Sequence, residues 1–213
     1  YTDPISETVT IEAGTQYLIN DVGNDYEVRS LENGAWNVID SLTNNFEYNQ
    51  KVLAAYGTGA YEGDKWGIKL GVRIENTDLK TELTNTNEKN HQEYTNFFPS
   101  AHTSYKINND VSLQLGYSKR IYRPRLWDLN PFFNISDNYN VRKGNPNLLP
   151  EFSDSYELTG IYKIGKATMN TSLYHRYTTE VVERVFTIVD NIKTTMPLNI
   201  GTNKMLGVEM NGK

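Results

Sequence analysis

A strict two-residue alternation between apolar and polar side chains is the feature of this sequence that most restricts its fold. Between positions 66 and 75, every even position holds a large apolar residue, and every odd position holds a glycine or a charged residue. Residues 111–120 repeat the pattern, with apolar side chains at odd positions as far as Tyr117. Because successive side chains of a β-strand point to opposite faces, this period predicts strands with one apolar and one polar face.

Weaker copies of the same pattern occur along most of the chain. They predict further strands over residues 48–60, 97–107, 156–164, 167–177, 181–189 and 206–210. Together with the two clear segments this makes about eight strands, most of them about 10 residues long, which is the length that crosses a bilayer when tilted. No stretch approaches the roughly 18 apolar residues of a membrane-spanning helix, so a membrane location would depend on strands.

The expected connections between these strands are alternately short and long. Gly and Asn, which suit tight hairpins, mark short turns at 63–64, 108–110, 165 and 201–203. Longer polar stretches cover 76–94 and 122–153, with a shorter one at 190–193. Short periplasmic turns and long extracellular loops are typical of outer-membrane barrels. The predicted fold class is therefore all-β, an antiparallel transmembrane β-barrel segment of about eight strands from a larger barrel.

A soluble β-sandwich or a solenoid is the alternative that the alternation leaves open, because both also combine two-faced strands with Gly-rich turns. Two features count against it. Four charged residues on the polar faces, Lys69, Arg73, Glu75 and Arg120, would be buried in a sandwich core. A connection as long as 122–153 is also unusual in a compact domain.

Composition excludes several classes of protein. The net charge of -5 and the pI of about 5.3 argue against a nucleic-acid partner. The local cluster of Lys119, Arg120, Arg123 and Arg125 is better explained as arginines of a pore or loop. The absence of cysteine excludes disulfides and thiolate metal sites. A mean hydropathy of -0.61 still suits barrel strands, of which only every second residue must be apolar.

A series of short motifs from Phe46 onward is similar to a known family. The motifs are Phe46-Glu47-Tyr48, Val52-Leu53-Ala54-Ala55-Tyr56, Gly71-Val72-Arg73-Ile74-Glu75-Asn76-Thr77, Phe98-Pro99-Ser100, Gly116-Tyr117-Ser118-Lys119-Arg120-Ile121, Arg123-Pro124, Leu129-Asn130-Pro131-Phe132, Gly144-Asn145-Pro146-Asn147-Leu148-Leu149-Pro150-Glu151, Ser155-Tyr156-Glu157-Leu158, Asn199-Ile200-Gly201 and Gly207-Val208-Glu209. In this order and spacing they resemble the barrel domain of a TonB-dependent receptor, specifically of the outer membrane protein β-barrel family. On this resemblance residues 46–213 are part of the barrel. Residues 1–45 alternate less regularly, and they are expected to be an extracellular loop or an extra hairpin.

The resemblance implies a location in the Gram-negative outer membrane, in a barrel of about 22 strands plugged by an N-terminal domain. It implies binding and import of a scarce ligand, namely a siderophore, haem, cobalamin, a glycan or a peptide, with no cofactor. The implied partners are outer-membrane lipid, the TonB energy-coupling protein acting through a plug domain that this chain lacks, and a surface lipoprotein. A surface-binding or adhesin barrel without active transport is the alternative. Without a secretory signal, and with alternation running into both ends, the chain is expected to be a fragment.

Candidate functional residues follow from loop position, because loops carried by a rigid scaffold commonly bind ligands. The ligand contacts predicted in the long loop are Arg123, Arg125, Trp127, Asp128, Asn134 and Asp137. Three scattered histidines, His91, His102 and His175, lack metal-ligand spacing. No group of residues resembles a catalytic triad, so the sequence predicts neither an enzyme nor a metal site.

Overall fold

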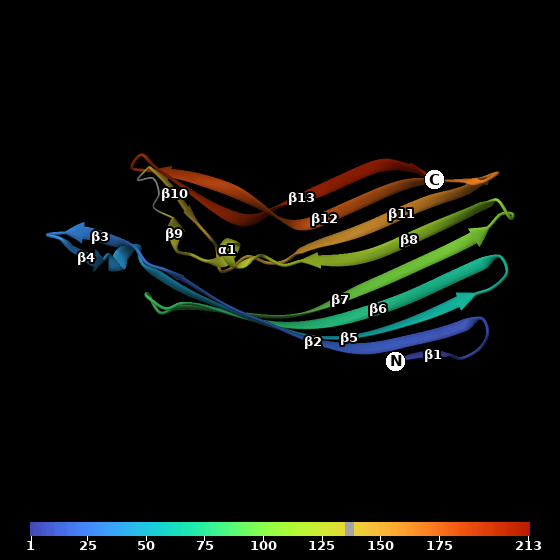
Figure 1. The fold of residues 1–213 in the computed structure, drawn as a ribbon, viewed down its shortest axis with the longest axis horizontal. Helices are drawn as coiled ribbons and strands as arrows, with labels where there is room; N and C mark the ends of the chain where they lie inside the picture. The colour runs from blue at the N-terminus through green and yellow to red at the C-terminus, as the bar shows by residue number, and fades with distance from the viewer. Residues whose placement is uncertain (135–138) are drawn as a thin grey trace.

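The computed structural model describes residues 1–134 and 139–213, which form one large twisted sheet and a small hairpin (Figure 1). In the order in which they pair, the strands of the sheet are β1 (Thr2–Pro4), β2 (Val9–Tyr26), β5 (Asn44–Glu62), β6 (Trp66–Leu83), β7 (Glu88–Lys106), β8 (Val111–Tyr122), β11 (Glu151–Ile164), β12 (Ala167–Val189), β13 (Ile192–Gly212), β10 (Asn140–Lys143) and β9 (Phe133–Asn134). All pairs are antiparallel except β13 with β10. Over the described residues the sheet is open.

The alternation predicted for residues 66–75 gives β6 two different faces. Leu70 is 57% exposed on the face that we call outer, whose β6 residues are Ile68, Leu70, Val72 and Ile74. The register continues this face across the sheet, because Leu70 lies opposite Ala101, which lies opposite Tyr117. An apolar band that remains exposed across several strands is what a lipid-facing surface requires.

The other face, which we call inner, is polar and cross-linked by side chains. Lys69 Nζ donates a hydrogen bond of 3.1 Å to Glu12 Oε2, and Thr58 Oγ1 donates one of 2.9 Å to the same oxygen. Arg73 Nη2 donates to Gln16 Oε1 at 2.8 Å. These contacts join β2, β5 and β6 across the inner face.

The connections separate the two ends of the sheet. We call the turn end the one where residues 63–65, 107–110 and 165–166 join β5 to β6, β7 to β8 and β11 to β12. These positions confirm three of the predicted short turns, and Gly165 has a φ of 63° in its turn. The opposite end, which we call the loop end, carries the connections 27–43, 84–87, 123–150 and 190–191. We refer to 123–150 as the long loop.

The expected long connection at 76–94 is wrong. β6 continues to Leu83 and β7 begins at Glu88, so only a turn at 84–87 separates them. Strands of this length extend beyond the roughly 10 residues that a bilayer needs. Outside lipid the outer face no longer has to be apolar, so the alternation of hydrophobicity fades although the strands continue.

The expected turn at 201–203 and the expected strand break at 178–180 are also wrong. Both lie within the single hairpin of β12 and β13. The register between these strands shifts between Thr178 and Val181, where Val181 lies opposite Gly201 and Glu180 has a φ of 55°. A β-bulge of this kind interrupts the alternation along a strand, and a sequence pattern cannot distinguish such an interruption from a turn.

The first forty-five residues contain two strands of the sheet, β1 and β2, as well as a separate hairpin. β2 pairs with β5 along its whole length, from Val9 opposite Tyr61 to Tyr26 opposite Asn44. β3 (Arg29–Glu32) and β4 (Ala35–Val38) form a two-stranded hairpin beyond the loop end, followed by a short 3-10 helix, η1 (Asp40–Leu42) (Figure 1).

The buried core of the described chain lies at the loop end. It forms where the long loop, which includes α1 (Leu126–Leu129), packs onto the inner face of the sheet. Its members are Phe46, Tyr48, Leu79, Leu83, Leu129 and Leu148. Leu129 and Leu148, both from the loop, are 0% and 1% exposed. Full burial of such a side chain contributes about 1.5–3 kcal/mol, so the loop is held down on the sheet.

No helix in residues 1–134 or 139–213 combines the length and the apolar character needed to cross a membrane.

Candidate functional site

A buried ion pair anchors the start of the long loop. Arg123 Nη2 donates to Glu75 Oε2 at 2.6 Å and to Thr77 Oγ1 at 3.0 Å, and both acceptors lie on the inner face of β6. Arg73 Nε donates to the other oxygen of Glu75 at 2.6 Å. The side chains of Arg123 and Glu75 are only 20% and 10% exposed, so solvent screens this pair little.

The next part of the loop is held by backbone contacts around α1. Asp128 accepts a hydrogen bond from the backbone N–H of Arg125 at 3.3 Å, which caps the start of this short helix. The backbone N–H of Gly144 donates to the carbonyl of Asn130 at 2.7 Å. A Cβ at position 144 would lie 2.5 Å from that oxygen, so only glycine permits this approach.

Residues 145–150 bridge two strands that lie apart in the sheet. Gln92 Nε2, on β7, donates to the carbonyl of Pro146 at 2.7 Å. On the other side, Asn199 of β13 accepts from the backbone N–H of Leu149 and donates to its carbonyl, both at 2.9 Å. Between β7 and β12 lie β8 and β11. β8 ends, and β11 begins, farther from the loop end than their neighbours reach, and the long loop fills the space that they leave (Figure 1).

A pocket of about 430 Å³ lies at the loop end beside α1. Its lining residues are Asn24, Tyr26, Asn44, Trp127, Asp128, Asn130, Phe132, Arg142, Lys143, Gly144, Arg184, Thr195 and Pro197. Residues of β2 and β5 therefore share one pocket with residues of β12 and β13, from the opposite side of the sheet order. This is possible only if the sheet curves toward its inner face, as the wall of a barrel does.

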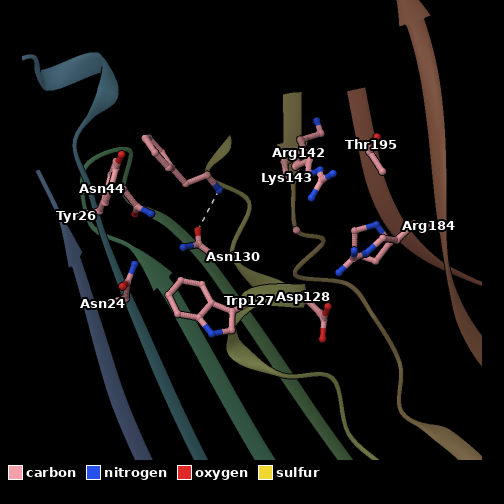
Figure 2. Close-up of a pocket in the computed structure, with 13 residues that line it drawn as sticks. Asn24, Tyr26, Asn44, Trp127, Asp128, Asn130, Arg142, Lys143, Arg184 and Thr195 are labelled. Carbon is pink, nitrogen blue, oxygen red and sulfur yellow. Dashed lines mark hydrogen bonds between the residues drawn. The ribbon is translucent and has the colours of Figure 1, made fainter. Parts of the chain in front are cut away.

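The pocket has two chemically different sides (Figure 2). In this view Tyr26, Asn44 and Trp127 lie toward one side, and Arg142, Lys143 and Arg184 lie toward the other, with Asp128 below them. The volume lies within the range of small-molecule sites, and an aromatic surface combined with a few polar groups is their usual chemistry.

The structure brings together some of the predicted ligand-binding residues and separates others. Trp127 and Asp128 line the pocket. Arg123 is engaged with Glu75, and the guanidinium of Arg125 lies 5.9 Å from the ring centre of Tyr122. The backbone of Asn134 belongs to β9, paired with Arg142 of β10. Asp137 lies outside the described residues.

Loop position alone missed several pocket residues. Arg184 lies on β12 just beyond the bulge, and Asn24 and Asn44 lie on β2 and β5, far from the long loop in sequence. Only curvature of the sheet brings these residues to α1. Arg142 and Lys143 could have been predicted from the sequence as ligand contacts, because they form a second basic group in the same long loop.

The described parts of the chain contain no cluster of His, Asp and Glu side chains suited to hold a metal ion. A second hollow, of about 510 Å³, lies on the inner face closer to the turn end. Its lining includes positively and negatively charged side chains, among them Lys69, Arg120, Glu157 and Arg176. It belongs to the polar wall of the sheet.

Comparison with known proteins identifies this architecture. The sequence model of the outer membrane protein beta-barrel family matches residues 1–213. The chain belongs to this family. It is therefore a segment of an outer-membrane β-barrel, which confirms the fold class, the location and the resemblance inferred from the motifs. No curated protein sequence matches it.

Solved structures support the family's barrel fold. The copper transporter OprC superposes with a TM-score of 0.74 at 11% identity, covering 97% of this chain and 33% of OprC. The FrpB iron transporter from Neisseria meningitidis (F3-3 variant) has a TM-score of 0.68 at 11% identity, covering 99% and 31%. The Serratia marcescens hemophore receptor HasR has a TM-score of 0.67 at 10% identity, covering 96% and 38%. The chain spans about a third of the length of these structures, and at such identities the likeness concerns the fold.

Proposed function

We propose that this chain is part of the barrel wall of an outer-membrane TonB-dependent receptor that binds a scarce ligand at the loop end and imports it. The observation that carries the proposal is the long loop, which folds onto the inner face and builds a pocket of about 430 Å³ there. A loop that served only as a surface tether would not need Leu129 and Leu148 buried against the sheet. Import would require the plug domain and the TonB energy-coupling protein, and a surface lipoprotein could assist capture.

The neighbours with the same fold support transport as the parent protein's activity. Their names describe transport of copper or iron, or reception of a haem-carrying hemophore. These ligands differ, and one scaffold can serve several of them. The proposal therefore covers a siderophore, haem, cobalamin, a glycan or a peptide, and the chain has no part in a catalytic reaction.

A surface-binding or adhesin function is the second candidate, and the β3–β4 hairpin favours it. The hairpin extends past the loop end, and it carries Trp36 and Leu31, which are 66% and 59% exposed (Figure 1). Exposed apolar side chains on a projecting element are common in protein interaction sites.

Substitution of two tryptophans distinguishes the two candidate functions. Their side chains are similarly exposed, Trp127 to 69% and Trp36 to 66%. Only Trp127 lines the pocket. The parent gene would be deleted and replaced by wild type, Trp127→Ala or Trp36→Ala. Growth would then be measured on limiting iron, copper, haem, cobalamin, oligosaccharide or peptide, with and without the energy-coupling protein.

A receptor predicts that one nutrient requires both the gene and energy coupling, and that Trp127→Ala weakens its uptake about tenfold while Trp36→Ala has little effect. Growth that is independent of the gene on every nutrient, together with surface attachment lost in Trp36→Ala, would favour the adhesin.

A further inference from the structure

Three basic side chains gather on one side of the loop-end pocket (Figure 2). Arg142 and Lys143 come from β10, and Arg184 comes from β12. Within residues 1–134 and 139–213, none of the three side chains has a carboxylate or another hydrogen-bond acceptor as partner. Among the lining residues that the structure describes, Asp128 is the one acidic side chain.

This excess of positive charge contrasts with the inner face around β6. Lys69 is paired with Glu12, and Arg73 and Arg123 share Glu75. The whole chain has a net charge of -5, so acidic residues are not scarce. Like charges that line one pocket repel each other, and an anionic ligand bound there would relieve this repulsion.

The opposite side of the pocket indicates what else the ligand carries. The indole of Trp127 offers an exposed aromatic surface, which favours a flat ring. Asn44 is 2% exposed, and its Oδ1 is buried without a donor in the described residues. A buried acceptor without a donor is costly, so a hydroxyl or N–H group of a ligand would stabilise it.

We propose that this pocket binds an aromatic polyanion that also carries a hydroxyl group. Its anionic groups lie on Arg142, Lys143 and Arg184, where guanidinium groups donate paired hydrogen bonds to carboxylate or phosphate oxygens. Its ring lies on Trp127, and its hydroxyl donates to Asn44. This inference rests on the proposed receptor function and names the chemical class of the ligand.

The test uses the full-length parent receptor in detergent and 5-hydroxyisophthalate, a small ring with two carboxylates and one hydroxyl. Calorimetric titration should show binding that weakens as salt is added. The dimethyl ester of the same compound, which lacks both charges, should bind at least about tenfold more weakly. Arg184→Gln should also weaken binding of the dianion about tenfold or more.

Arg29→Gln is the matched control, because it removes one positive charge from the β3–β4 hairpin at the same end of the barrel. It should change affinity by no more than about twofold, since a screened charge outside the pocket contributes little. Each variant is accepted only if its denaturant midpoint in detergent equals that of wild type, so that a loss of affinity reports on the pocket.

Three outcomes would overturn the inference: no binding of 5-hydroxyisophthalate, equal binding of its ester, or equal losses in Arg184→Gln and Arg29→Gln. Binding in detergent does not depend on energy coupling. An absence of binding beside intact import of another ligand would therefore refute only the ligand class. Binding of the dianion without any energy-dependent import would refute only the transport function.

Discussion

Arg123 and Glu75 form a 2.6 Å ion pair that joins the first residue of the long loop to the inner face of β6. The carboxylate of Glu75 also accepts a hydrogen bond from Arg73, so one buried anion serves two guanidinium groups. The pair is enclosed by the loop that it anchors. We expect the position of α1, and with it the pocket, to depend on this contact.

Glu75→Gln should therefore destabilise the barrel, because it leaves the partly buried Arg123 and Arg73 without an anion. Loss of one partner of a buried ion pair costs about 3–5 kcal/mol. The measurement is denaturant unfolding of the full-length barrel in lipid vesicles. Lys80→Gln is the control, since it removes an exposed pair with Asp78 on the same strand and should have little effect. Equal losses would show that the loop does not depend on Glu75.

Substitutions at neighbouring positions of β6 test which face meets lipid. Leu70→Arg should cost about 2–4 kcal/mol near the bilayer midplane, because lipid cannot solvate the charge. Lys69→Gln should scarcely affect folding, because Lys69 lies on the wet inner face beside Glu12. Refolding into vesicles, titrated with denaturant, measures both. A larger loss for the lysine variant would mean that the faces are exchanged.

Gly144→Ala should loosen the long loop, because a Cβ there meets the carbonyl oxygens of Asn130 and Asp128 at 2.5 and 2.7 Å. Both are backbone atoms, so the overlap cannot be relieved by rotating a side chain. Overpacking of this kind costs about 1–3 kcal/mol. Gly59→Ala is the control, since a Cβ at Gly59 meets nothing within 4 Å. Protease cleavage within 123–150 on intact cells should rise only for Gly144→Ala, and equal resistance would contradict the close packing.

The assignment of the loop end to the cell exterior can be tested by labelling, because this chain contains no cysteine of its own. Asn33→Cys, at the tip of the β3–β4 hairpin, should react with a membrane-impermeant maleimide on intact cells. Asn109→Cys, in the turn between β7 and β8, should react only after the outer membrane is permeabilised. The parent without an introduced cysteine gives the background. The reverse order of labelling would invert the topology.

Much of the sheet could be predicted from the sequence, because lipid imposes a rule on every strand that crosses it. Where one face meets hydrocarbon and the other meets water, apolar and polar residues must alternate, as they do from Trp66 to Ile74. The rule fails where lipid ends. Past the lipid, β6 continues to Leu83 and β7 begins at Glu88. The polar residues of these two extensions were predicted to be a loop.

The sheet contains eight strands of 12 or more residues, and this agreement with the expected eight arises partly by compensation. β12 was predicted as two strands because its bulge near Glu180 interrupts the alternation. β2 was not counted among the eight, because glycine, threonine and asparagine weaken its pattern and residues 1–45 were expected to be a loop or an extra hairpin. Local periodicity cannot separate a bulge from a turn, since both interrupt the period in the same way.

The sequence by itself determined the family, the antiparallel sheet and the face that each residue of β6 presents, because these follow from motif order and from the two-residue period of a strand. The loop-end pocket was decided only by the tertiary structure. Arg184, Asn44 and Trp127 lie far apart in the chain and share the pocket because the sheet curves and the long loop folds inward. Curvature arises from twist and register summed over many strands, and no local pattern of residues encodes that sum.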